Sequence, residues 1–227
     1  LSESNIGNVL IVSEDYDSSS PEQNELGGVF RFDFTAAGPT GVSVEDIVLA
    51  NIQDAGGLVE LYDINDNLIK QISIQSDDSI TLTVDIRAAQ VASMTVTLFG
   101  LGAISELKVC VSSTMDPTIA PTPHPTMEPS PKPTEQPTPA PSFICRFKDT
   151  IDFNEFDSGD IVDILSVKGF DIPVMANRLV LDGSTGKVEE VSSNRAMLLD
   201  TSLTSSDSDL SESNIGNVLI VSEDYDS

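Results

Sequence analysis

The sequence is poor in several residue types that binding and catalytic sites commonly use. It contains no tryptophan, one histidine and two cysteines, and only 5% of its residues are aromatic. A folded core must therefore be filled mainly by isoleucine, leucine, valine and phenylalanine. The single histidine, His124, lies in a proline-rich stretch, so a folded domain has no histidine to act as a base or a metal ligand. We therefore expect that the protein is not an enzyme.

Positive charge is also scarce. Eleven lysines and arginines stand against 37 aspartates and glutamates, which gives a formal net charge of −26. Such a chain repels phosphate groups and anionic membrane surfaces, and we expect no nucleic acid among its partners. The sequence has no apolar run long enough to cross a bilayer, so we expect no membrane insertion in this segment. The acidic surface favours cations and keeps a crowded assembly soluble.

The two ends of the sequence carry the same string. Leu1–Ser18 and Leu210–Ser227 both read LSESNIGNVLIVSEDYDS, without a substitution. The offset between them is 210 − 1 = 209 residues, which is longer than the unit of ordinary solenoids. Because the match runs from the first residue to the last, we interpret the chain as a window cut from a tandem-repeat protein with a period of 209 residues.

A proline-rich segment divides the chain. Residues 112–144 hold ten of the 13 prolines, and we predict a semi-rigid, polyproline-II-like linker there, extending about 3.1 Å per residue. Residues 1–111 then form the C-terminal part of one repeat, and residues 145–227 form the N-terminal part of the next. A complete repeat is 145–227 followed by 19–111, about 175 residues, which is enough to bury a core.

Outside the linker, apolar and polar residues alternate with the period of β-strands. Phe30, Phe32 and Phe34 fall on one face of such a segment, and turns recur roughly every 8–12 residues. This pattern predicts an all-β fold in which antiparallel β-sandwich domains, jelly-roll-like, are joined by the linker. Only residues 87–91 indicate a helical turn. The predicted strands are 28–34, 43–50, 58–62, 68–74, 80–86, 94–98, 103–110, 150–153, 161–167, 170–174, 178–182, 187–191, 196–200 and 217–222.

The two cysteines flank the linker. In the rejoined repeat, Cys145 is the first structured residue and Cys110 the last, so we predict a disulfide that joins each to the equivalent cysteine across the repeat frame. Closing a loop of about 175 residues stabilises a fold by at most about 4–5 kcal/mol. A bridge between Cys110 and Cys145 around the linker, or two free buried thiols, are the alternatives. A disulfide fits an extracellular protein.

Two acidic loops flank the predicted strand at 217–222, and calcium is the cofactor we expect there. Calcium takes six to eight oxygen ligands and tolerates irregular loops. The two loops could lie at opposite ends of the strand, too far apart to form one shared site. Solvated turns are the alternative to metal sites. The candidate ligands are Asp200, Asp207 and Asp209 before the strand, Glu223, Asp224 and Asp226 after it, and the copies Glu14, Asp15 and Asp17.

Two other acidic segments are explained better by turns. Asp63-Ile-Asn-Asp-Asn67 starts like an EF-hand loop, but Leu68 replaces the glycine at position six and Ile74 replaces the glutamate at position twelve. We predict a β-hairpin turn there. Residues 152–160 could cap a calcium site, but turn chemistry accounts for most of that pattern.

Several segments resemble a domain that recurs in extracellular proteins of marine algae, diatoms among them, and of some marine bacteria. They read FNEFDSGDIVDI, GNVLIVSEDYDSSSPEQNELGGVFRFDF, VELYDINDNLIKQI and MTVTLFGLGAISELKVC. The Pro-Thr-Pro spacers are similar to those of diatom cell-surface and adhesive proteins. The resemblance implies a structural, adhesive or glycan-contacting role outside the cell and carries no catalytic motif.

Together these observations lead to two functional hypotheses. The first is a structural or adhesive tandem-repeat protein of an extracellular fibre, adhesive or cell-wall layer, stabilised by calcium, whose partners are neighbouring copies of the repeat. The alternative is a calcium-dependent, lectin-like module that binds extracellular polysaccharide. In both, tandem copies strengthen weak contacts through effective concentration.

Overall fold

The computed structural model describes residues 8–12, 26–38, 40–52, 56–76, 81–111, 147–157, 159–167, 169–192 and 196–200. These residues form strands and one short 3-10 turn, Thr35–Ala37. The strands are β1 (Asn8–Val12), β2 (Gly28–Asp33), β3 (Val42–Ala50), β4 (Gly57–Tyr62), β5 (Leu68–Ile74), β6 (Thr81–Val91), β7 (Ser93–Leu98), β8 (Ala103–Val111), β9 (Phe147–Asp152), β10 (Ile164–Val167), β11 (Phe170–Leu181), β12 (Val188–Val191) and β13 (Ala196–Asp200).

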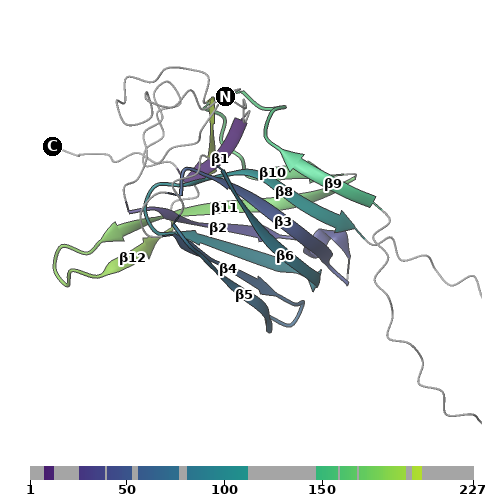
Figure 1. Ribbon diagram of the computed structural model, residues 1–227, viewed down its shortest axis with the longest axis horizontal. Coiled ribbons are helices and arrows are strands. Elements are labelled where there is room, and N and C mark those ends of the chain that lie inside the picture. The colour runs from purple at the N-terminus through teal and green to yellow at the C-terminus, as the bar shows by residue number, and fades with distance from the viewer. Residues whose placement is uncertain are drawn as a thin grey trace, which may run out of the picture.

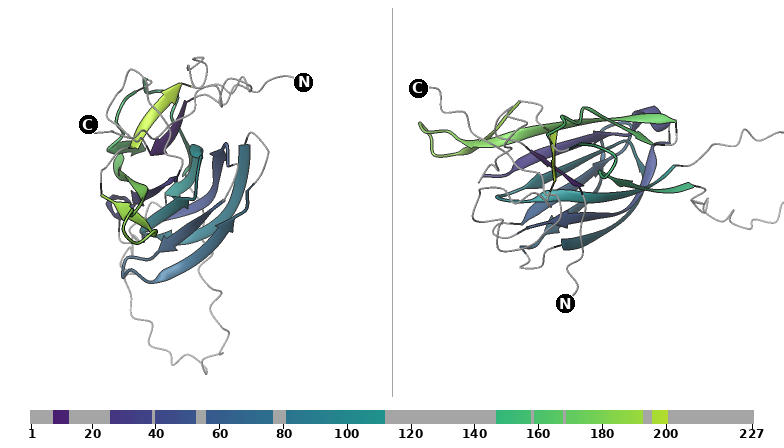
Figure 2. Two further views of the ribbon diagram at one scale, coloured as in Figure 1. Left: turned by 90° about the vertical axis from the view of Figure 1, so that its left-hand side faces the viewer. Right: turned by 90° about the horizontal axis from the view of Figure 1, so that it is seen from above.

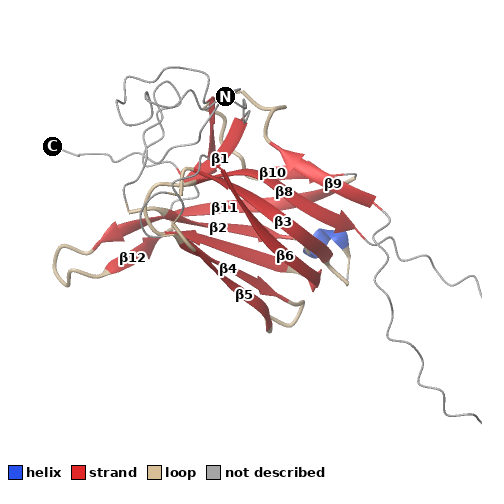
Figure 3. Cartoon of the chain, in the orientation of Figure 1, coloured by secondary structure: helices blue, strands red, loops and turns tan. Residues whose placement is uncertain are grey.

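The strands form two antiparallel sheets that pack as a β-sandwich, as predicted (Figures 1 and 3). One sheet has the order β13-β1-β8-β3-β6, with β9 beside β8. The other has the order β10-β11-β2-β7-β4-β5, with β12 beside β11. Figure 2 shows the two layers from the side and from above. In the part of the chain that the structure describes, no helix is long and apolar enough to cross a membrane.

The core lies between the two sheets and consists of alternate strand residues. Phe30 and Phe32 of β2 are at most 1% exposed, and the ring of Phe34 stacks on that of Phe32 with centroids 6.4 Å apart. Leucine, isoleucine and valine side chains fill most of the remaining space, as the lack of tryptophan requires. Each such fully buried side chain contributes about 1.5–3 kcal/mol through the hydrophobic effect.

The segments that we assign to successive repeats complete one sandwich in this chain. Strands β1–β8 come from one side of the linker and β9–β13 from the other, and each sheet contains strands of both groups. The groups meet where β1 pairs with β13, β8 with β9, and β2 with β11. The linker, residues 112–144, lies outside the described residues, and the repeat frame stays a prediction.

Two details of the predicted strand pattern are wrong, and the strand predicted at 217–222 lies outside the described residues. Residues 87–91 are the end of β6 and not a helical turn: Arg87 and Gln90 have left-handed φ angles of 44° and 58°, and the pairing with β3 shifts register there. These irregularities break the strand alternation. The segments 170–174 and 178–182 form one strand, β11, because it pairs first with β10 and then continues along β2.

The hairpin predicted between β4 and β5 is confirmed. One carboxylate oxygen of Asp63 accepts the backbone N–H groups of Asn65 and Asn67, at 2.8 and 2.9 Å. Hydrogen bonds from Asn67 are the largest cause that lowers the pKa of Asp63. The carboxylate holds the turn closed, so this acidic segment needs no metal.

Candidate functional site

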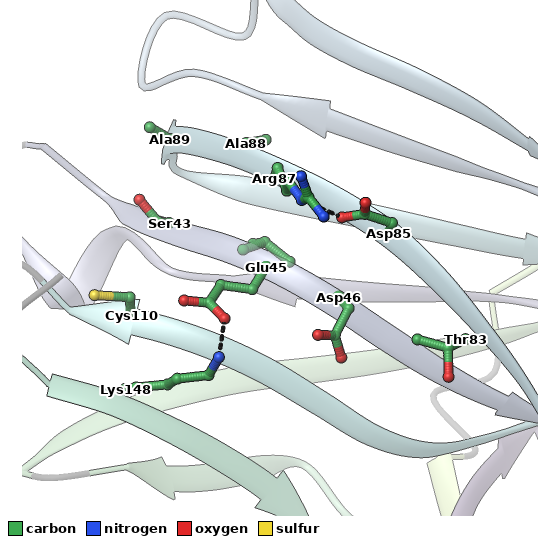
Figure 4. A pocket seen from close by; sticks show the side chains of 11 residues that line it. Ser43, Glu45, Asp46, Thr83, Asp85, Arg87, Ala88, Ala89, Cys110 and Lys148 are labelled. Atoms are coloured by element: carbon green, nitrogen blue, oxygen red, sulfur yellow. Dashed lines mark ion pairs between the residues drawn. The ribbon is translucent and has the colours of Figure 1, made fainter.

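A hollow of about 690 Å³ lies on the outer face of the six-stranded sheet, over β3, β6, β8 and β9 (Figure 4). Its polar lining comes from strands that are far apart in the sequence. The polar and charged side chains that line it are Ser43, Glu45, Asp46, Thr83, Asp85, Arg87 and Lys148.

A β-bulge in β3 places two adjacent acidic residues on this face. Val44 pairs with Val109 of β8, and Asp46 pairs with the next residue, Lys108, so Glu45 is the extra residue on β3. In a regular strand, adjacent side chains point to opposite faces, and a bulge removes that alternation locally. Glu45 and Asp46 are both only partly buried, whereas Val44 is fully buried. The bulge therefore supplies two carboxylates to the hollow.

The opposite rim comes from the irregular end of β6. Arg87, with its left-handed φ angle of 44°, donates from Nε to the carboxylate of Asp85 at 2.9 Å. The Arg87 side chain is 81% exposed, so its remaining N–H donors face solvent at the mouth of the hollow. Figure 4 shows the guanidinium and the Asp85 carboxylate side by side above β3.

The carboxylates of β3 are paired with lysines from neighbouring strands. Lys148 of β9 forms an ion pair with Glu45, and Lys108 of β8 approaches Asp46 at 2.9 Å. The hydrogen bond that Lys108 donates to the Asp46 carboxylate is the largest cause that raises the pKa of Lys108, and partial burial opposes it. Ion pairs at the protein surface typically contribute about 0–1 kcal/mol to stability. Their main effect is to orient the carboxylates.

One hydroxyl in the hollow makes no hydrogen bond within the described part of the chain. The Oγ atom of Ser43 is buried and has no partner there, and the residue pairs with Cys110 across β3 and β8. A buried hydroxyl without a partner loses the hydrogen bonds that it makes in water. Ser43 can therefore donate to, and accept from, a polar group that enters the hollow.

The chemistry of the hollow suits a polyhydroxylated ligand. Carboxylates, a guanidinium, an ammonium group and hydroxyls offer both donors and acceptors, and none of the described residues that line the space is aromatic. The sequence did not predict this site, because the polar residues of the site come from three separate strands, β3, β6 and β9. The only local signal was the Glu45-Asp46 pair, which interrupts the alternation of β3.

A second hollow, of about 420 Å³, lies between β9 and β10 and is lined by Asp149, Asp152 and Glu155. Asp152 is engaged in a turn, because its carboxylate accepts the backbone N–H of Asn154 at 3.1 Å. Among the residues that the structure describes, no group of three or more histidines, cysteines, aspartates or glutamates is arranged to hold a metal ion. Asp152 therefore takes part in the turn that the sequence predicts at residues 152–160, whereas Asp149 lies in β9 and pairs with Val109 of β8.

Most of the predicted calcium ligands lie outside the described residues. Asp200 ends β13 opposite Asn8, but its side chain is not among those described. The loop after Asp200 thus starts at one end of β1, and the loop with Glu14 follows Val12 at the other end, about 13 Å away at ~3.3 Å per residue. The remaining candidates outside the described residues are Asp207, Asp209, Glu223, Asp224, Asp226, Asp15 and Asp17.

Cys110 is fully buried at the end of β8 and is disulfide-bonded. The other cysteine of the chain, Cys145, is separated from β9 by one residue, Arg146, and lies outside the described residues. Which copy of Cys145 joins Cys110 in the repeating protein stays a prediction.

No protein-family model matches the chain, and no curated protein matches it. Two solved structures are weakly similar, and both are described as fucose-binding modules of Streptococcus pneumoniae. One is 17% identical, with a TM-score of 0.29, covering 40% of this chain and 72% of its own. The other is also 17% identical, with a TM-score of 0.25, covering 44% of this chain and 91% of its own. Scores this low carry no weight for the function of the present chain.

Proposed function

We propose that this chain is part of an extracellular tandem array of acidic β-sandwiches joined by proline-rich spacers, with a structural or adhesive role. The observation that carries the proposal is the position of the strand ends next to the linker. Val111, the last residue of β8, pairs with Phe147, the first residue of β9, at one corner of the sandwich (Figure 1). A repeat built this way receives its preceding and following spacers at the same place.

Adjacent attachment points determine how the array responds to tension. In the repeat frame, tension enters at β9 and leaves at β8, and these strands are antiparallel neighbours with six paired residues each. Without a crosslink, the pull would separate their hydrogen bonds one after another from the linker end. A disulfide between the ends, with Cys110 as one partner, diverts the tension past the sandwich, so the spacers stretch while the sandwich stays folded.

Electron microscopy of the native protein, with and without calcium, tests the array. We expect globular particles at a regular spacing, separated by at most about 100 Å for a linker of 33 residues at ~3.1 Å per residue. Calcium bound at the acidic loops would narrow the spread of that spacing. Particles without regular spacing would contradict the proposal.

A second candidate function, glycan binding, is favoured by one observation. The hollow over β3 and β6 combines oriented carboxylates, the exposed donors of Arg87 and the unpartnered hydroxyl of Ser43. Extracellular polysaccharide is the ligand class that this lining fits, and many copies in an array would bind it by avidity.

A glycan array probed with the chain, with and without EDTA, tests this second function. Arg87→Ala removes a donor from the hollow, whereas Lys187→Ala removes an exposed charge from the β11–β12 hairpin and serves as the matched control. We expect binding that Arg87→Ala weakens and Lys187→Ala preserves. Equal binding by both variants would exclude the hollow as the glycan site.

A further inference from the structure

Strand β1 fills an interior position of the six-stranded sheet. It lies between β13 and β8, and its residues Val9–Val12 are at most 2% exposed. It pairs with β13 along its full length, from Asn8 opposite Asp200 to Val12 opposite Ala196. We call the space that it occupies between these two strands the β1 slot. An empty slot would expose the core and leave both neighbouring strands with unpaired backbone groups.

The slot also recognises individual side chains of its occupant. The Asn8 backbone N–H donates to Oδ1 of Asn154 at 2.9 Å, and the Asn8 amide donates to the carbonyl of Phe156 at 2.7 Å. At the other end, Val12 packs so closely on Gly28 that a Cβ atom on this glycine would lie 2.4 Å from a Val12 methyl group. The slot therefore selects a strand that has asparagine at its first position and valine at its last.

The sequence provides this occupant twice. Asn217–Val221 reads NVLIV, like β1, and the flanking residues of the two copies are also identical, over eighteen residues in all. Every contact that the slot makes with Asn8–Val12 is therefore available to Asn217–Val221. The slot has no means of distinguishing the copies by their side chains.

The segments that connect each copy to the sandwich, which we call its tethers, do not distinguish the two copies either. Sixteen residues separate Asp200 from Asn217, and fifteen separate Val12 from Gly28. Both tethers span short distances, because Asp200 lies opposite Asn8 and Gly28 contacts Val12. Loop-closure probability falls with roughly the 3/2 power of length, so the two copies differ by only about 1.1-fold. A tether this short holds its strand at an effective millimolar concentration, which favours a copy from the same chain over one from a second molecule.

We infer that the β1 slot is a strand-exchange site whose second ligand is Asn217–Val221 of the same chain. With Asn8–Val12 in the slot, β13 and β1 are connected only through the linker and the other strands. With Asn217–Val221 in the slot, β13 and its new partner become consecutive strands joined by residues 201–216. Within an array, this exchange determines whether β9–β13 are completed by the strands before the linker or by those after it.

Three variants of the full chain test the exchange. Leu10 is fully buried, so Leu10→Arg places an unpaired charge in the core whenever the first copy occupies the slot. Leu219→Arg does the same for the second copy, and the third variant carries both substitutions. Thermal unfolding followed by circular dichroism should give both single variants a cooperative transition like that of the parent, and the double variant none.

Each other pattern of results overturns the inference. If Leu10→Arg unfolds like the double variant, only the first copy can occupy the slot. If the double variant melts like the parent, the slot needs neither copy. Light scattering of Leu10→Arg over a hundredfold dilution identifies the source of the strand: a monomer at all concentrations supports the same chain, and dimers that dissociate on dilution would show that a second molecule supplies it.

Discussion

Single contacts decide where strands can approach each other most closely. Gly28 opens β2 directly beside Val12, and Gly27, which precedes it, has a left-handed φ angle of 83° and lies against the backbone of Leu98. A side chain at either glycine would push β1 or β7 away. The Gly-Gly pair that opens β2 is therefore a packing feature of the sandwich, where the two sheets approach at the β1 slot.

Gly28→Ala should destabilise the sandwich by about 1–3 kcal/mol, the usual cost of an extra methyl group in a packed site. Urea unfolding at pH 7 measures the change in free energy. Gly183→Ala is the matched control, because a Cβ atom at that glycine meets no atom within 4 Å. Equal stabilities for the two variants would contradict the close packing of Val12 on Gly28.

Arg31 of β2 connects β2 with β12 in the seven-stranded sheet. It makes two hydrogen bonds to Glu190 of β12, at 2.5 and 2.7 Å, and Asn177 of β11 donates to the same carboxylate. The hydrogen bond from Arg31 is the largest cause that lowers the pKa of Glu190. A lowered pKa means that this carboxylate stabilises the fold above its unfolded-state pKa, and that the contribution is lost as the pH falls through the folded-state pKa.

Glu190→Gln should therefore reduce stability at pH 7 by about 1 kcal/mol or less, because both side chains of the pair are about one-third exposed. The difference from the parent should shrink as the pH is lowered from 7 to 3, since the parent carboxylate then becomes protonated. Denaturant unfolding at several pH values gives both quantities, with Glu189→Gln as the control for loss of a neighbouring charge. A difference that grows at low pH would contradict this role.

At the scale of elements, alternation predicted the strands well where they are regular. β5 and β13 have the predicted bounds, and β2, β3, β4, β7, β8 and β12 differ from theirs by one residue. Alternation fails at β-bulges, because the side-chain period of two is lost there. Glu45 in β3 and the left-handed residues of β6 are such points, and the hollow lies between them. The assembly of its polar lining from three strands, β3, β6 and β9, could not be deduced from local sequence.

The acidic segments that follow β13 and β1 in the sequence carry the calcium prediction. Adding calcium should raise the melting temperature, because a ligand that binds only the folded state stabilises it by about 2.7 kcal/mol at 100 times its dissociation constant. Calorimetry with calcium, magnesium and EDTA measures the effect. An unchanged melting temperature would exclude calcium as a structural cofactor of these loops.

The residues responsible can be separated with variants of the same chain. Replacing Asp207 and Asp209 by asparagine should abolish the calcium-dependent shift. Asp171→Asn, at the edge pairing of β10 and β11, should leave it unchanged, because Asp171 hydrogen-bonds Ser166 at 2.8 Å within that pairing. A calcium-dependent rise in melting temperature that persists after both replacements would show that calcium binds at other residues.

For the whole molecule, the strand order agrees with the rejoined repeat that the repeated string predicts. β13 ends opposite the start of β1, as consecutive strands of the rejoined repeat would, and β8 ends opposite the start of β9. The sequence predicted that Cys110 and Cys145 close a repeat at its ends. It could not predict that β8 and β9 pair with each other, because that pairing joins segments on opposite sides of the linker.

Single-molecule stretching of the native array, before and after reduction, tests most directly whether tension bypasses the sandwiches. Under oxidising conditions we expect only the elastic extension of the spacers. After reduction, we expect unfolding steps that each release about 175 residues, or about 600 Å at ~3.3–3.6 Å per residue. Steps of that length in the oxidised array would show that tension passes through β8 and β9, and would contradict the proposed architecture.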